Sequence, residues 1–103
     1  MIQPQDLFSK KFIFPSRVKQ FGGTFYFYIP KEFVEILGLG DKNVRVQVGI
    51  APLGRNAFAI YHAKLKKYGS TYYCLIPRNE AKNLNLKPKD VIVVAMEVEP
   101  HGF

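Results

Sequence analysis

An internal repeat is the feature that most constrains what this chain can fold into. When the sequence is slid past itself by 47 positions, residues 11–48 align without a gap with residues 58–95, and 12 of the 38 pairs are identical. Units of about 40 residues are too small to bury their own apolar faces. The two copies must therefore pack together, most simply about a pseudo-twofold axis. We expect a single domain over residues 1–103, with repeats at about 11–49 and 58–96 and a tail at 97–103.

Each copy has the residue pattern of a β-hairpin. Short apolar runs at 12–14 and 59–61 precede stretches of mixed basic and apolar residues, which is typical of half-exposed strands. Gly22-Gly23 and Gly69-Ser70 then supply the positive φ that a tight turn requires. The segments that follow each turn are dense in the aromatic and β-branched residues that favour strands. These patterns predict a mostly β fold.

A short helix is predicted after each hairpin. Pro30 and Pro77 suit the first position of a helix, and the aligned Gly38 and Asn85 suit the left-handed residue that ends one. The helix residues expected to face inward, from their spacing of three and four, are Phe33, Ile36, Leu37, Ala81 and Leu84.

The last strand of each copy differs from its partner in polarity. Val44, Val46 and Val48 alternate with polar residues, which predicts a half-exposed strand. The segment Val91 to Met96 is apolar throughout, which predicts burial on both faces or contact with a partner. We expect the N-terminal strand, Phe12 to Phe14, to be structural and to fill the gap at the end of the second copy.

The composition favours a packed protein with an anionic partner. The chain is 48% hydrophobic and 22% charged, and its net charge is +7, spread over both halves. Such a charge favours nucleic acid or an anionic membrane surface as partner. The single cysteine, Cys74, excludes an internal disulfide and fits a reducing compartment. Because no apolar run is long enough to cross a bilayer and the N-terminus does not resemble a signal peptide, we expect a cytoplasmic protein with no membrane partner.

Catalysis is not predicted. The carboxylates fall singly, and no glycine-rich phosphate loop precedes a helix. His62 and His101 are too isolated to predict a metal site or acid/base pair. We therefore expect neither an enzyme nor a cofactor.

The segments of each copy, taken in order, resemble the AbrB/MazE/SpoVT family of swapped-hairpin DNA-binding domains. The resemblance consists of a basic strand, a Gly-Gly-Thr or Gly-Ser-Thr turn, a strand ending in Ile-Pro, a short helix, Leu-Gly-Leu or Leu-Asn-Leu, and a valine strand. It covers about residues 11–96, twice over. Family members usually build one barrel from two identical chains. The resemblance implies that this chain builds a pseudo-twofold swapped-hairpin β-barrel alone.

In that family the basic first strand and the turn contact DNA, which implies contacts from both copies here. Independently, lysines along a strand edge and exposed turn amides suit phosphates. If the two first strands lie side by side, the basic residues form one face, in which the adjacent Lys66 and Lys67 should dominate. The candidate DNA-binding residues are Arg17, Lys19, Gln20, Gly22, Gly23, Thr24, Lys64, Lys66, Lys67, Gly69, Ser70 and Thr71.

Two departures from the family separate this chain from its antitoxin-like members. Those members often place a basic residue before Ile-Pro, where this chain has Tyr28 or Leu75. We also expect no long tail of the kind with which the antitoxins grip their toxin. The first departure weighs against sequence-specific readout, and the second weighs against an antitoxin role.

The sequence therefore predicts a nucleoid-associated protein that binds double-stranded DNA, either a transcriptional regulator or an architectural protein. The alternatives are an unrecognised enzyme and a protein-interaction module, such as an antitoxin-like or assembly factor, that uses the strand Val91 to Met96. A further homodimer could form through that same strand. The aromatic runs at residues 25–28 and 72–73 could stack on exposed bases, but core and cross-strand packing are favoured for them.

Overall fold

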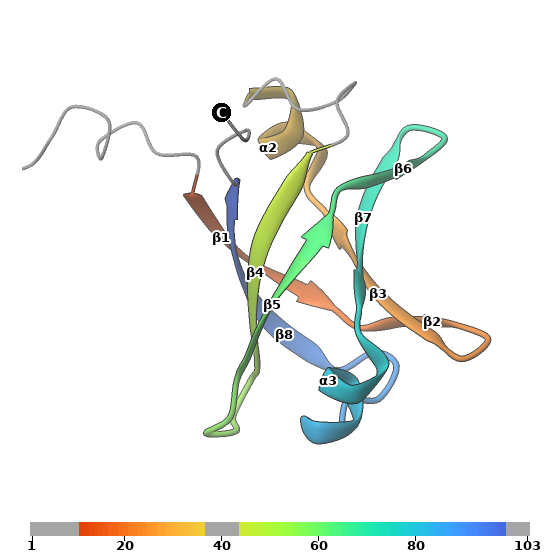
Figure 1. The fold of residues 1–103 in the computed structure, drawn as a ribbon, viewed down its shortest axis with the longest axis vertical. Helices are drawn as coiled ribbons and strands as arrows, with labels where there is room; N and C mark the ends of the chain where they lie inside the picture. Colours follow the sequence, from red (N-terminus) through yellow and green to blue (C-terminus); the bar gives the residue numbers. More distant parts are fainter. Residues whose placement is uncertain (1–10, 37–43, 99–103) are drawn as a thin grey trace, which may run out of the picture.

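Strands make up most of the structure, a computed structural model that describes residues 11–36 and 44–98 (Figure 1). The predicted mostly β class is confirmed. In chain order the elements are β1 (Lys11–Arg17), β2 (Lys19–Phe21), β3 (Thr24–Ile29), α2 (Lys31–Ile36), β4 (Arg45–Pro52), β5 (Ala59–Lys64), β6 (Lys66–Tyr68), β7 (Thr71–Ile76), α3 (Arg78–Asn83) and β8 (Val91–Val98).

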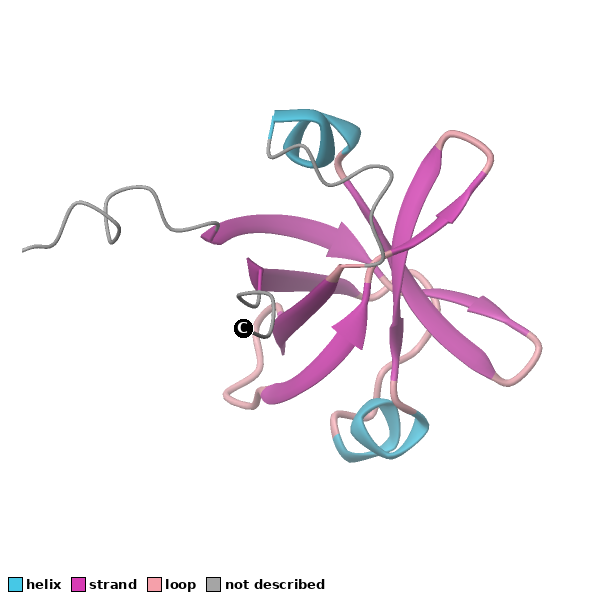
Figure 2. Ribbon diagram, turned by 45° about the horizontal axis from the view of Figure 1, so that its top comes forward, coloured by secondary structure: helices cyan, strands magenta, loops and turns pink. Residues whose placement is uncertain are grey.

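The strands form two antiparallel sheets. Sheet A has the order β1-β8-β4-β5, and sheet B has the order β2-β3-β7-β6. If each strand of the first half is exchanged for its equivalent in the second half, each sheet keeps the same strand order, read from the opposite edge. In Figure 2 the helices lie at opposite ends of the molecule, with the two hairpins of sheet B on one side and sheet A on the other. The N-terminal strand β1 pairs with β8 along its whole length, so it is structural, as expected.

The register of sheet B is symmetric about one residue pair. Phe27 of β3 lies opposite Cys74 of β7, and these two positions are equivalent at the offset of 47. Stepping away from them, Tyr28 lies opposite Tyr73 and Tyr26 lies opposite Leu75. The two halves of the chain therefore occupy equivalent places on either side of the centre of sheet B.

The last strands are equivalent at an offset of 46, which the ungapped alignment misses. Val46, Val48 and Ile50 face the core from β4, and Ile92, Val94 and Met96 do so from β8. The aligned identity of Val46 with Val93 pairs an inward residue with an outward one. The second copy is thus one residue shorter between its hairpin and its last strand. Hydrogen bonds agree, because the Val18 amide donates to Asp90 at 2.8 Å and the equivalent Leu65 amide donates to Val44 at 2.9 Å.

The segment Val91 to Met96 is buried on one face, not both. Its alternate residues Val93 and Ala95 point away from the core and are exposed. Both edges of β8 are paired, one with β1 and the other with β4. The apolar composition therefore reflects a central strand whose outer face is covered by small and β-branched side chains.

Both helices begin one residue after the proline that was expected to open them, and Pro77 is the residue that precedes the first turn of α3. Helix α2 buries Val34, whereas Ile36, which was predicted to face inward, is exposed. A six-residue helix has fewer than two turns, so the spacing of apolar residues fixes its inward face poorly.

In the second copy Ala81 and Leu84 are buried as predicted, and Asn85 adopts the expected positive φ. Leu37 and Gly38 lie outside the described residues.

The buried side chains of both sheets form one hydrophobic cluster. Phe14 of β1 links the sheets, since its ring centroid lies 6.2 Å from that of Phe27 in β3. Cys74 is fully buried in this cluster, and burial raises the pKa of its thiol to about 12. The thiol therefore stays protonated at neutral pH and serves as a core residue. Neither helix that the structure describes is long and apolar enough to cross a membrane.

One core position differs between the copies in a way that affects stability. The Tyr61 hydroxyl is buried and has no hydrogen-bond partner among the described residues, and this burial raises its pKa. The aligned residue in the first copy is Phe14. A buried polar group without a partner costs roughly 1–3 kcal/mol. Tyr61→Phe is therefore expected to raise the free energy of unfolding by about 1 kcal/mol, measured by urea denaturation, and a decrease would contradict this account.

Candidate nucleic-acid interface

The residues predicted to contact DNA lie mostly on two hairpins at opposite edges of sheet B (Figure 1). The turns adopt the expected geometry, with φ of 60° at Gly22 and 63° at Gly69. The side chains of both first strands are exposed along their length. The two first strands do not lie side by side, which was the condition for one basic face, because β3 and β7 stand between β2 and β6. The two basic strands flank the sheet instead of forming one continuous face.

The pleat of the hairpins divides the candidate residues between the two faces of sheet B. Lys66 lies opposite Tyr73 on the outer face of sheet B, the face turned away from the core, whereas Lys67 lies opposite the buried Tyr72. The side chains of the two adjacent lysines therefore point to opposite sides of the sheet. The Lys67 ammonium lies 5.5 Å from the centroid of the Tyr72 ring. Of these two lysines, Lys66 is therefore the one that lies on the outer face of sheet B.

In the first copy, Lys19 lies opposite Tyr26 on the outer face and Gln20 lies opposite Phe25 on the other. The Gln20 amide donates to the carbonyl of Gly22, which holds the turn. Arg17 is also engaged, because its guanidinium donates to the carbonyl of Lys89 at 3.0 Å. Of the basic candidates in this copy, Lys19 is the one placed on the outer face.

The outer face of sheet B carries aromatic rings that the sequence pattern favoured for the core. Inward and outward residues alternate, so Phe27 and Tyr72 are buried while Tyr26, Tyr28 and Tyr73 face outward. We call the following set the tyrosine face, and these residues line a hollow of about 480 Å³ together with Thr24 and Thr71: Phe21, Tyr26, Tyr28, Tyr68, Tyr73 and Leu75.

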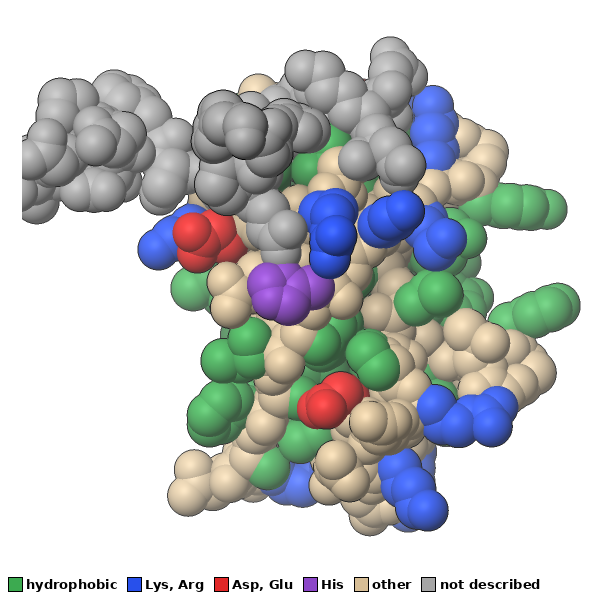
Figure 3. Space-filling view, viewed as in Figure 1, with side chains coloured by type: hydrophobic (Ala, Val, Ile, Leu, Met, Phe, Trp, Pro, Cys, Tyr) green, Lys and Arg blue, Asp and Glu red, His purple; other side chains and the backbone are tan. Residues whose placement is uncertain are grey.

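The rings of the tyrosine face are in mutual contact. The Tyr26 ring centroid lies 5.6 Å from that of Tyr28 and 5.7 Å from that of Tyr73, both in edge-to-face arrangements. A side-chain hydrogen bond with Tyr28 is the main cause that raises the pKa of Tyr26. The Lys19 ammonium lies 5.8 Å from the centroid of the Tyr28 ring. At the ends of the hairpins Phe21 and Tyr68 are 82% and 81% exposed, and hydrophobic side chains protrude there in Figure 3.

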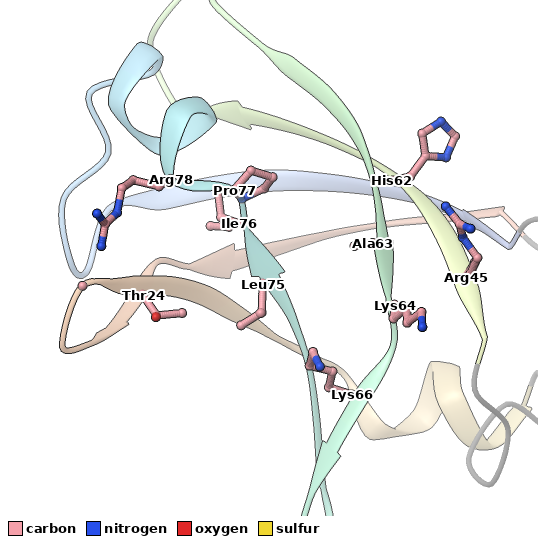
Figure 4. Close-up of a pocket in the computed structure, with 11 residues that line it drawn as sticks. Thr24, Arg45, His62, Ala63, Lys64, Lys66, Leu75, Ile76, Pro77 and Arg78 are labelled. Atoms are coloured by element: carbon pink, nitrogen blue, oxygen red, sulfur yellow. The ribbon is translucent and has the colours of Figure 1, made fainter.

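A second hollow, of about 570 Å³, adjoins the tyrosine face and shares Thr24 and Leu75 with it. We call it the basic pocket, and its cationic or titratable lining residues are Arg45, His62, Lys64, Lys66 and Arg78. Figure 4 shows Arg78 and Thr24 at one end of the pocket, Arg45, Lys64 and Lys66 at the other, and Leu75 between them. Figure 3 shows basic side chains gathered beside the histidine.

The basic pocket brings like charges together. Arg45 of β4 lies directly opposite Lys64 of β5 in the register of sheet A, and like charges at such positions are destabilising. At the other end, a Cβ placed on Gly23 would lie 2.6 Å from a guanidinium nitrogen of Arg78. The Arg78 side chain thus lies against the turn of the other half's hairpin. Among the described residues, no acidic side chain lines either hollow, so the charged side chains that line them are basic.

Three members of the pocket were not predicted from the sequence: Arg45, His62 and Arg78. They come from three different elements or their ends, so no local motif links them. A usable signal does exist for Arg78, which follows the helix-opening Pro77 at the position where the first copy has Lys31. Among residues 11–36 and 44–98, no three His, Cys, Asp or Glu side chains are grouped as a metal ion would require.

The equivalent place in the first half is built differently. Val91 and Pro15 stand where the pocket has Arg45 and His62. Lys31, the counterpart of Arg78, lies 3.6 Å from Glu35 in an ion pair. Arg17, the counterpart of Lys64, donates to a backbone carbonyl. The cationic hollow therefore exists on one side of the described structure, and the symmetry of the backbone does not extend to the charges.

Comparison with known proteins gives information on the fold only. No protein-family model and no curated protein sequence matches the chain. Among solved structures, the chain is similar to the solution structure of PHS018 from Pyrococcus horikoshii, with a TM-score of 0.67 and 19% sequence identity, over 87% of this chain and 95% of that one. The architecture of two sheets therefore has a counterpart in an experimental structure.

Proposed function

We propose that this protein binds double-stranded DNA, as a transcriptional regulator or an architectural protein of the nucleoid, and that it is not an enzyme. The observation that carries the proposal is the basic pocket beside the β6–β7 hairpin, which gathers cations from β4, β5, β6 and the start of α3. Lys66 lines this pocket and Lys19 flanks the opposite edge of sheet B. The two lysines would contact phosphates on either side of a groove.

The architecture supports this proposal through its resemblance to swapped-hairpin DNA-binding domains. Strand β1 of the first half pairs with β8 of the second, and β4 of the first lies between β8 and β5. We propose that this exchange is the swapped-hairpin arrangement, made within one chain and approaching a closed barrel. The hairpin turns at Gly22-Gly23 and Gly69-Ser70, with Thr24 and Thr71 beside them, would then present backbone amides and hydroxyls to phosphates.

A titration on specific and random duplexes at several salt concentrations tests the proposal. Because phosphate contacts release counterions, the logarithm of the binding constant should fall linearly with the logarithm of salt concentration, by about 0.9 per phosphate contact. The expected result is binding to both duplexes with a steep salt dependence. Absence of binding to either duplex at low salt would overturn the proposal.

A protein-interaction role is the second candidate, and the outer face of sheet A favours it. Ile13, Ile60 and Val93 are exposed there, around the small residues Gly49 and Ala95. The partner consistent with this face is a second copy of the chain, because the face carries little net charge. Strand-to-strand pairing through β8 is blocked, since both its edges are occupied. Sedimentation of the wild type against an Ile13→Lys, Ile60→Lys variant tests this, and two monomers would exclude it.

A further inference from the structure

We propose that the tyrosine face binds unpaired bases, so that the protein prefers a single-stranded nucleic acid to a duplex of the same charge. This inference rests on the proposed function and extends it to the kind of strand that is bound. Its basis is the joining of two hollows, one aromatic and one cationic, through the shared residues Thr24 and Leu75. A nucleotide offers the two matching parts, a flat base and a charged phosphate.

The aromatic hollow has the properties of a stacking platform. It lies on the open face of a four-stranded antiparallel sheet, an arrangement on which aromatic side chains stack two or three bases. The ring centroids of Tyr26 and Tyr28 lie 5.6 Å apart at an interplanar angle of 75°, so the two rings would meet different bases. Tyr28 is 43% exposed. Phe21 and Tyr68 extend the platform along the two hairpins.

The charge around the two hollows favours a single-stranded nucleic acid over another protein as the ligand. The described residues that line the two hollows include no acidic side chain, and Lys19 and Lys66 flank the platform at its two edges. A second copy of the chain, itself at net charge +7, would bring these lysines against their equivalents. A duplex would satisfy the lysines with phosphates, but its bases are already stacked inside the helix. A single strand satisfies the lysines and the rings together.

The repeat supplies a matched set of variants. Tyr28 occupies the position that Leu75 holds in the second half. Tyr28→Leu therefore introduces into the first half the residue that the second half already has at this position. Tyr28→Phe keeps the ring, and Leu75→Tyr adds one. Phe58→Ala removes an exposed ring outside both hollows and serves as the control.

The experiment is a titration of each variant with three probes of about 12 nucleotides, a length within the range that small single-strand binding folds cover. The probes are oligo(dT), an abasic strand with the same phosphates, and a duplex with the same total number of phosphates. Because the chain has no tryptophan and six tyrosines, stacking is also observed directly as quenching of tyrosine fluorescence. Thermal unfolding of each variant confirms that it folds.

The expected result is that oligo(dT) binds at least about tenfold more tightly than the abasic strand, and also more tightly than the duplex. Tyr28→Leu should lower the preference for oligo(dT) over the abasic strand by about tenfold and leave binding of the abasic strand unchanged. Tyr28→Phe and Phe58→Ala should leave this preference intact. Leu75→Tyr should increase it. Equal binding of oligo(dT) and the abasic strand would overturn the inference. If the duplex then still binds with a steep salt dependence, the proposed function stands without it. If no probe binds, both fail.

Discussion

Replacing Phe14 with alanine is expected to lower the free energy of unfolding by about 3–5 kcal/mol, the usual cost of deleting a buried phenylalanine ring. Phe14 is 3% exposed and its ring lies near those of Phe12, Phe27 and Phe33. It therefore ties β1 to both sheet B and α2. Because a small domain has only about 5–15 kcal/mol of stability in total, the variant should lose a large fraction of the protein's stability. Urea denaturation followed by circular dichroism measures the change.

The neighbouring residue provides the control for this prediction. Ile13 sits on the same strand but is 69% exposed, so Ile13→Ala should change the stability by no more than about 0.5 kcal/mol. Deleting residues 1–14 should cost at least as much as Phe14→Ala, because it also uncovers an edge of β8. Equal stabilities of Phe14→Ala and the wild type would mean that β1 is not part of the folded core.

Replacing both Lys64 and Lys66 with glutamate is expected to weaken duplex binding by about a hundredfold at low salt, because each lost phosphate contact lowers the affinity. The salt slope should fall by about 0.9 for each phosphate that the variant no longer neutralises. Both side chains line the basic pocket, and no ion pair joins either to a carboxylate in the part of the chain that the structure describes. Because both are exposed, the fold should tolerate the change. Anisotropy titrations at several salt concentrations measure the effect.

A variant with the same net charge separates local contact from general attraction. Lys82 and Lys87 are exposed on and after α3 and line neither hollow, so Lys82→Glu with Lys87→Glu changes the overall charge equally. That control should lose much less affinity than the pocket variant. If the two double variants lose affinity to the same extent, binding follows net charge and the basic pocket does not touch the DNA.

Local chemistry made most of the secondary structure predictable from the repeat. Turn glycines, strand-forming aromatics and helix-opening prolines act over a few residues, and all lie where the pattern placed them to within about one residue. The last strands were misaligned because valine is suitable on either face of a strand. The identity of Val46 with Val93 carried no information about which face is buried. Only the pairing with neighbouring strands fixes that choice.

The candidate site was less predictable, because its charges come from distant parts of the chain. Lys64 and Lys66 were found in the sequence as part of a basic strand. Arg45 joins them through the pairing of β4 with β5, and Arg78 through its contact with Gly23. The division of Lys66 from Lys67 follows from strand alternation and could have been anticipated. The hydrogen bond from the Arg17 guanidinium to the Lys89 carbonyl could not have been anticipated, since it depends on how the two halves pack together.

The unequal charges of the two halves give the molecule a direction. A barrel made from two identical chains presents the same groups to a ligand entering from either end, so it cannot distinguish one orientation of a strand from the other. Here a ligand lying across the centre of sheet B would meet Tyr28 on one side, and Leu75 and Arg78 on the other. Joining the halves in one chain allowed each to change alone. A bound strand would consequently be held with a fixed polarity, its 5′ end on one side and its 3′ end on the other.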